Sequence, residues 1–168
     1  MYQRILVPVD GSDTANAGLA EAIKLAKLTG AQLRLVHVID EMPFIMNAGS
    51  YGAMTGDLIT MMKEGGELIL AAAKKMVEAE GLPVDSVMFD SLNGRLSERI
   101  ADEAMQWDAD LIVLGTHGRH GVGRMLLGSG AEQILRSSNV PVLLIRAVDA
   151  VPAALPTTLP KALSQEIA

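Results

Sequence analysis

Short apolar runs alternate with segments of helical periodicity along most of this chain. Five such runs are six to nine residues long and carry few charges, as strands buried on both faces of a sheet do. They cover residues 4–9, 31–39, 84–89, 108–114 and 140–145. Four helix-like segments, with apolar residues three and four positions apart, separate them. This alternation predicts an open α/β fold with a parallel five-stranded sheet.

A glycine-rich loop joins the fourth apolar run to the next helix-like segment. It extends from Gly115 to Ser129 and contains Arg119 and Arg124, with no Asp or Glu between positions 111 and 131. Glycine allows a ligand to approach the backbone, and the first turn of a helix offers unpaired N–H groups. Because the whole chain has a net charge of −6, this local reversal of sign indicates an anionic ligand, most often a phosphate.

The glycine spacing adds a family resemblance. Two residues separate Gly115 from Gly118, and nine separate Gly118 from the pair Gly128 and Ser129. This pattern resembles the nucleotide-binding motif of the universal stress protein family. The resemblance covers roughly residues 2–146, including the strings ILVPVDGS at 5–12, VHVID at 36–40 and VPVLLIR at 140–146.

The resemblance implies a Rossmann-like sheet, of the adenine nucleotide alpha-hydrolase type, with strand order 3-2-1-4-5 and helices on both faces. It also implies binding of ATP, together with Mg²⁺, by a regulatory or protective module of the stress response. Ligands of such sheets bind beyond the carboxyl ends of the strands where the strand order reverses, here between strands one and four. The two most polar, glycine-rich connections, residues 10–12 and 115–129, follow these same two strands.

Site residues follow from this placement. By resemblance, Pro8, Val9 and Asp10 border the adenine and ribose, and Val38 meets the adenine edge. The other predicted nucleotide contacts lie in the two connections and are Ser12, Gly115, Thr116, His117, Gly118, Arg119, Arg124, Gly128, Ser129 and Gly130. Asp10 has two further interpretations, as an Asx bond within its own turn and as a weak candidate to orient the metal. Both arginines are equally compatible with solvated loop positions.

Other phosphate-site signatures fail in this sequence. There is no Walker string GxxxxGK[ST] and no GxGxxG, and residues 117–120 have the wrong order for the HxGH of adenylyl transferases. A phosphoacceptor receiver domain would use Asp10 and Asp90, but Gly11 and Arg146 stand where it needs an acid and a lysine.

Catalysis and metal binding are not indicated. No nucleophile–base–orienter set is visible, so we predict no catalytic residue and at most slow ATP hydrolysis or autophosphorylation at Ser129 or Thr116. Cysteine is absent, and the three histidines, His37 among them, have no further ligand that would complete a metal site. We expect His37 to lie near the core.

The bulk composition bounds the partners. The acidic balance argues against nucleic-acid binding. No signal peptide and no run of roughly 18 apolar residues is present, which favours a soluble cytoplasmic protein without a membrane span.

Three segments carry further expectations. Residues 41–56 lack a clear period and predict a long loop. The helix after them is predicted to bury one face, with a bend or close packing at the Gly65–Gly66 pair; the residues on that face are Leu58, Met61, Met62, Gly65, Ile69, Ala72, Ala73 and Met76. Residues 147–168, with a proline every four residues, predict an extended tail after a nucleotide-binding domain at 1–146.

Assembly and an alternative function complete the expectations. The family resemblance implies a homodimer formed through the strand from Val140 to Ile145. The alternative function is a nucleotide-independent interaction module of the same fold, with an unknown protein partner.

Overall fold

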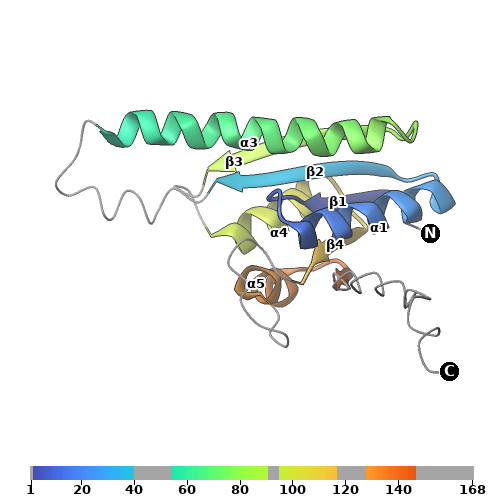
Figure 1. The fold of residues 1–168 in the computed structure, drawn as a ribbon. Helices are drawn as coiled ribbons and strands as arrows, with labels where there is room; N and C mark the ends of the chain where they lie inside the picture. Colours follow the sequence, from blue (N-terminus) through green and yellow to red (C-terminus); the bar gives the residue numbers. More distant parts are fainter. Residues whose placement is uncertain (1, 40–53, 91–94, 117–127, 147–168) are drawn as a thin grey trace, which may run out of the picture.

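The computed structural model describes residues 2–39, 54–90, 95–116 and 128–146 (Figure 1). The predicted tail at 147–168 and most of the predicted loop at 41–56 lie outside these residues. The described elements are β1 (Arg4–Pro8), α1 (Asp13–Thr29), β2 (Gln32–Ile39), α3 (Met54–Glu78), β3 (Val84–Asp90), α4 (Leu96–Gln106), β4 (Leu111–Gly115), α5 (Ser129–Ser137) and β5 (Val142–Ile145).

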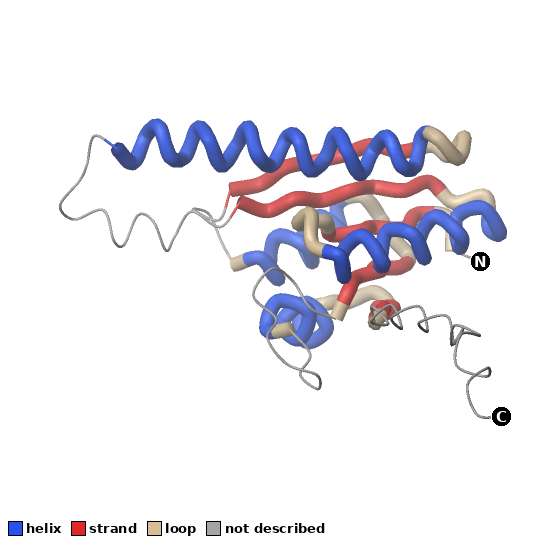
Figure 2. Tube along the Cα trace, viewed as in Figure 1, coloured by secondary structure: helices blue, strands red, loops and turns tan. Residues whose placement is uncertain are grey.

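The strands form one five-stranded sheet in the order β3-β2-β1-β4-β5, and every neighbouring pair is parallel. Figure 2 shows the helices packed along this sheet, and one buried cluster lies on each of its faces. Residues of α1 and α3 contribute to the first cluster, and residues of α4 and α5 to the second. The predicted fold class and strand order are confirmed.

Local signals set the ends of α1, for which the sequence predicts an N-cap at Ser12 and a helix end at Gly30. Ser12 is the N-cap, and its hydroxyl accepts a hydrogen bond from the Ala15 N–H at 3.2 Å. Gly30 follows the helix at φ 72°, a left-handed conformation that glycine adopts without a steric penalty.

Two strands begin later than predicted because polar turns precede them. Before β4, the Asp110 carboxylate accepts hydrogen bonds from the N–H groups of Gln3 (2.8 Å) and Arg4 (3.3 Å), and Asp108 lies at φ 51°. Before β5, the Ser138 hydroxyl accepts the Val140 N–H at 3.1 Å. Both turns occupy backbone groups that a longer strand would have used.

The start and the buried face of α3 correct two predictions. Residues 54–56, predicted as loop, are its first residues. Met61 and Met76, predicted to face the core, are 67% and 42% exposed. The face that packs on the sheet is instead shifted by one position and centres on four buried residues: Gly66, Leu70, Ala73 and Val77.

Close packing, rather than an interruption of the helix, explains Gly66. A Cβ on this residue would lie 2.8 Å from the His37 ring and 2.8 Å from the Met88 sulfur, so glycine lets α3 approach the sheet. For α4 the sequence predicts a buried face of Leu96, Ile100, Ala104 and Trp107. Ile100 and Ala104 are buried as predicted, whereas Leu96 is 37% exposed and Trp107 is half-buried. In the part of the chain that the structure describes, no helix combines the length and apolarity needed to cross a membrane.

Candidate functional site

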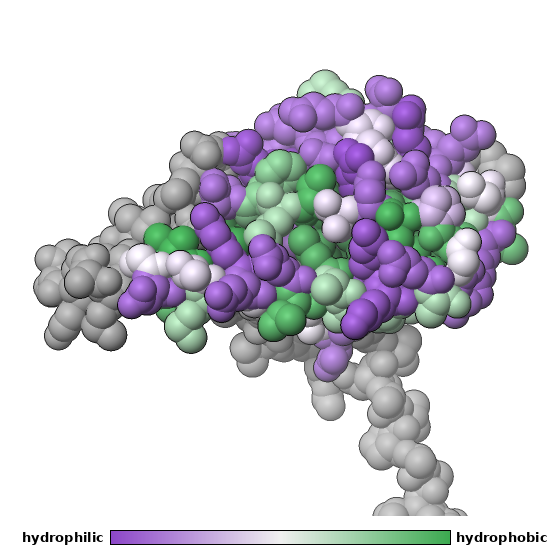
Figure 3. Space-filling view, turned by 90° about the horizontal axis from the view of Figure 1, so that it is seen from above, coloured by the Kyte–Doolittle hydropathy of each residue, from purple (hydrophilic) through white to green (hydrophobic). Residues whose placement is uncertain are grey.

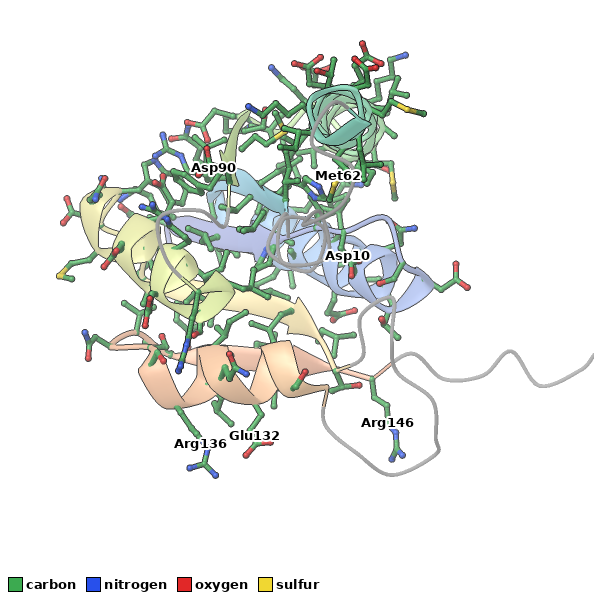
Figure 4. All side chains as sticks on the ribbon, turned by 90° about the vertical axis from the view of Figure 1, so that its left-hand side faces the viewer. Asp10, Met62, Asp90, Glu132, Arg136 and Arg146 are labelled. Carbon is green, nitrogen blue, oxygen red and sulfur yellow. The ribbon has the colours of Figure 1, made fainter. Side chains whose placement is uncertain are left out.

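The sheet opens at its carboxyl edge between β1 and β4. These two strands pair only at Ile5 with Leu111 and at Leu6 with Ile112, near their starts. β1 continues to pair with β2 as far as Pro8, and β4 with β5 as far as Gly115. The last residues of β1 and β4 therefore pair with different neighbouring strands and not with each other. The two strands separate at the point where the strand order reverses. Figure 4 looks onto this edge, with Asp10 near its centre.

The turn after β1 is held by its own polar groups. The Asp10 carboxylate accepts the Ser12 N–H at 2.9 Å across Gly11, which lies at φ 78°. This bond confirms the Asx interpretation of Asp10. The Ser12 and Thr14 hydroxyls lie 3.2 Å apart, so the turn gathers a carboxylate and two hydroxyls beside the opening.

A buried histidine fixes the backbone just before this turn. Nδ1 of His37, on β2, lies 2.7 Å from the Val9 carbonyl oxygen. Because a carbonyl only accepts, the ring must donate from Nδ1. The Val9 N–H in turn donates to the Val36 carbonyl at 2.8 Å, so residues of β2 bond both the N–H and the carbonyl of Val9. His37 and Val9 are 6% and 4% exposed, which confirms the expected core position of His37.

The end of β4 lies directly against the first turn of α1. A Cβ at Gly115 would overlap the Thr14 carbonyl and lie 2.5 Å from its carbon, and one at Gly18 would lie 3.0 Å from the Gly115 nitrogen. Two glycines thus allow helix backbone to touch strand backbone. The sequence pattern predicts Gly115 as a ligand contact, and the structure gives it a packing role as well.

Two hydrogen bonds fix both ends of the glycine-rich loop. The Thr116 N–H donates to the Ile145 carbonyl at 2.9 Å, and the Gly128 N–H donates to the Thr116 carbonyl at 2.6 Å. The second bond places the start of α5 at the end of β4. The four predicted contacts between these positions, His117, Gly118, Arg119 and Arg124, lie outside the described residues.

The start of α5 has no side-chain cap. Its N-cap is Gly128, and the Glu132 N–H already bonds the Gly128 carbonyl at 2.9 Å. A helix that begins on glycine presents its first-turn N–H groups without a side chain in front of them, which suits an anion. Ser129 is exposed there, and Gly130 is constrained from behind, because a Cβ on it would lie 3.1 Å from the Leu96 side chain.

The predicted residues outside the loop lie on β1 and β2. Pro8 ends β1, and Val38 is a half-buried residue of β2 that packs with the cluster on the α4 and α5 side. Among the described residues, no three His, Asp or Glu side chains come together to hold a metal ion. Chemically, the opening therefore offers hydroxyls, one carboxylate and main-chain N–H groups.

The structure thus brings the 8–12 turn and the start of α5 to one edge of the sheet, as the sequence predicts. Sequence reasoning missed the bond from His37 to Val9 and the role of Gly18. A polar residue inside an otherwise apolar strand was the available signal for His37. Gly18 gives a weaker signal, because a single glycine within a helix has many possible causes.

Comparison with known proteins gives one consistent family. The model of the universal stress protein family matches residues 1–146. The chain is 35% identical over 147 residues to universal stress protein MJ0531 of Methanocaldococcus jannaschii, covering 87% of this chain and 83% of that protein. It is 32% identical over 146 residues to the universal stress protein in the QAH/OAS sulfhydrylase 3′ region of Thermus aquaticus, covering 87% and 100%.

Solved structures give the same result. Protein MJ0577 of Methanocaldococcus jannaschii superposes with a TM-score of 0.78 at 29% identity, over 89% of this chain and 99% of that one. The universal stress protein from Archaeoglobus fulgidus in complex with dAMP superposes with a TM-score of 0.60 at 26% identity, over 86% and 98%.

Proposed function

Because this chain belongs to the universal stress protein family, we propose that it binds an adenine nucleotide, ATP in the first instance, in the opening between β1 and β4. The proposal rests above all on the hydrogen bond from the Gly128 N–H to the Thr116 carbonyl. That bond brings the uncapped start of α5 to the point where the sheet opens. The complex of the Archaeoglobus fulgidus protein with dAMP supports the choice of an adenine nucleotide.

The two sides of the opening bind different parts of the nucleotide. Pro8 and Val38 supply apolar surface for the adenine beside Val9, whose own side chain is buried, and Asp10 supplies a carboxylate for the ribose hydroxyls. The start of α5 supplies N–H groups for the phosphates. Micromolar binding needs about −8 kcal/mol, whereas a charge at a helix terminus contributes about 0.3–1 kcal/mol. The phosphate contacts and the adenine slot must therefore act together.

Mg²⁺ belongs to the same proposal as part of the ligand. The described residues offer no metal site of their own, whereas Mg²⁺ commonly binds through substrate phosphates and retained waters. Affinity for ATP is then expected to exceed affinity for AMP when Mg²⁺ is present, and chelation is expected to remove the difference.

Equilibrium titration of the purified protein with ATP and Mg²⁺ tests the proposal. A Gly128→Val variant should lower the affinity at least tenfold, because its side chain stands in front of the α5 N–H groups while its φ of −57° suits any residue. Gly56→Ala is the matched control, since a Cβ there meets nothing within 4 Å.

Unchanged affinity of the Gly128 variant would contradict the phosphate site. Absence of any nucleotide binding by the intact chain would favour the alternative function, a protein-interaction module that works without nucleotide.

We place the protein in the cytoplasm as a regulatory or protective stress module, with residues 1–146 as the nucleotide-binding domain and 147–168 as a tail. We further propose a homodimer through the β5 edge, with Thr116 and Ser129 as the hydroxyls for any slow phosphate chemistry. Transfer of label from γ-labelled ATP to the protein would test the last point.

A further inference from the structure

Helix α3 has a second apolar face beside the one that packs on the sheet. Its members are Leu58, Met61, Gly65, Leu68, Ala72 and Met76. Leu68 is 72% exposed and Met61 67%, Met76 and Ala72 are also exposed, and Leu58 and Gly65 are half-buried. The charged side chains of α3 occupy other positions, and Asp57 and Lys75 border these six. We call these six residues the α3 outer stripe.

The spacing of the outer stripe is that of a helix–helix seam. Its first five members are separated by three, four, three and four residues, the heptad pattern of positions that meet a partner helix. Figure 3 looks down on the α3 side, where hydrophobic residues (green) lie between hydrophilic ones (purple). In Figure 4, α3 is seen nearly end-on, with nitrogen and oxygen tips gathered on the side away from the sheet.

We propose that the outer stripe pairs with the outer stripe of a second copy of this chain, with the two helices antiparallel. Residue sizes complement one another in this arrangement when the two-fold axis passes between positions 66 and 67. Leu68 of one copy then faces Gly65 of the other, and Met61 faces Ala72. At these two contacts a large side chain meets a small one, as packing of one helix's side chains between those of another requires.

Charge at the border of the stripe supports the same register. Lys75 of one copy falls opposite Leu58 of the other and next to Asp57, and both charged residues are exposed. The lysine stem covers the leucine while the ammonium reaches the carboxylate. A parallel pair would instead place Asp57 beside Asp57 and Lys75 beside Lys75, which repel.

The charges of α3 also favour a protein over a lipid surface. Helices that lie on membranes are rich in Lys and Arg on their polar face. This helix carries three lysines and four carboxylates, a sum of −1. A membrane surface offers it little attraction.

Mass measurement on the full chain by sedimentation equilibrium tests the pairing. Leu68 fills the space opposite Gly65 of the second copy. Leu68→Lys should raise the dissociation constant of the α3 contact about tenfold or more, because the lysine places a charge between the two helices. Ala71→Lys is the matched control, because residue 71 is equally on α3 and exposed but lies on the charged side. Equal masses for wild type and the Leu68 variant at every concentration would overturn the proposal.

Disulfide cross-linking tests the orientation of the two helices. Because the chain has no native cysteine, only the introduced cysteines can form a disulfide. The double variant Met61→Cys with Ala72→Cys should form a covalent dimer on mild oxidation, whereas Ala72→Cys alone should not. A covalent dimer from the single variant, or none from the double one, would contradict the antiparallel register. Charge reversal gives a rescue: Asp57→Lys should weaken the dimer, and adding Lys75→Asp should restore it.

Discussion

Single atoms decide how close α1 lies to the candidate site. The contact of Gly115 with the Thr14 backbone leaves no room for a Cβ, and Gly18 repeats the requirement one helical turn later. Since α1 follows directly on the Asp10 turn, anything that moves α1 also moves that turn. Residue-level packing and the shape of the proposed nucleotide site are therefore coupled.

Replacing Gly115 by Ala is expected to destabilise the fold by about 1–3 kcal/mol, the usual cost of overpacking. The added methyl group would overlap the Thr14 carbonyl and force α1 away from β4. Urea denaturation measures the loss. Gly56→Ala, where the methyl meets nothing within 4 Å, should instead stabilise by up to about 1 kcal/mol. Identical midpoints for the two variants would show that α1 adjusts without cost.

Exchange of His37 distinguishes its hydrogen bond from its volume. The amide of Asn can donate from nearly the position of Nδ1, so His37→Asn should keep the bond to the Val9 carbonyl. His37→Leu removes the donor from a buried carbonyl and should cost about 1–3 kcal/mol more than the Asn variant. Thermal unfolding of both variants decides the matter, and a Leu variant more stable than the Asn variant would mean that packing dominates.

At the scale of elements, the sequence predicts what local chemistry determines and misses what packing determines. The Ser12 cap, the Gly30 end of α1 and the strand order of the family are all found in the structure. The prediction of the buried face of α3 was wrong because apolar residues cover more than half of the circumference of that helix. Periodicity detects both stripes but cannot tell which one meets the sheet. Likewise, the late starts of β4 and β5 depend on turn hydrogen bonds that the Asp110 carboxylate and the Ser138 hydroxyl accept.

An ionic network between elements escapes sequence reasoning for the same reason. Arg34 of β2 donates to the Asp85 carboxylate of β3 (2.8 and 2.6 Å) and to the buried Glu103 carboxylate of α4 (2.7 Å). Its guanidinium lies 4.7 Å from the centre of the Trp107 ring. The hydrogen bond with Asp85 raises the pKa of Arg34, and that with Glu103 adds to the effect against the opposing cost of burial. The Arg34 guanidinium thus links β2, β3 and α4.

Arg34→Met should destabilise the fold by about 3 kcal/mol, because it leaves Glu103 buried without its cation. The double variant with Glu103→Met should recover part of the loss. A raised pKa means that the stabilisation is fully present below the ordinary arginine pKa and is lost only as pH rises through the still higher folded value. Denaturation of the wild type and the single variant should therefore show the same loss of unfolding free energy at neutral and at mildly alkaline pH. A loss that shrinks with increasing pH would contradict this account.

At the scale of the whole molecule, the described residues form two apolar surfaces of interest at different places. One is the α3 outer stripe, and the other is the outer edge of β5, the last strand of the described sheet, where Leu143 is 37% exposed. An open strand edge with apolar side chains invites pairing with another strand. If each surface pairs with its own kind around a two-fold axis, the two contacts together build an assembly larger than a dimer.

Variants at the two surfaces should therefore act independently on the mass. Leu143→Lys places a charge at the β5 edge and should leave a dimer held by α3, whereas Leu68→Lys should leave a dimer held by β5. The double variant should be a monomer at micromolar concentration in light scattering. Met105→Lys, at a residue 61% exposed on α4 and outside both surfaces, serves as the control and should leave the mass unchanged. A Leu143 variant with the mass of the wild type would remove the β5 edge from the assembly, and the nucleotide site would stand without it, because none of the site's described residues lies on β5.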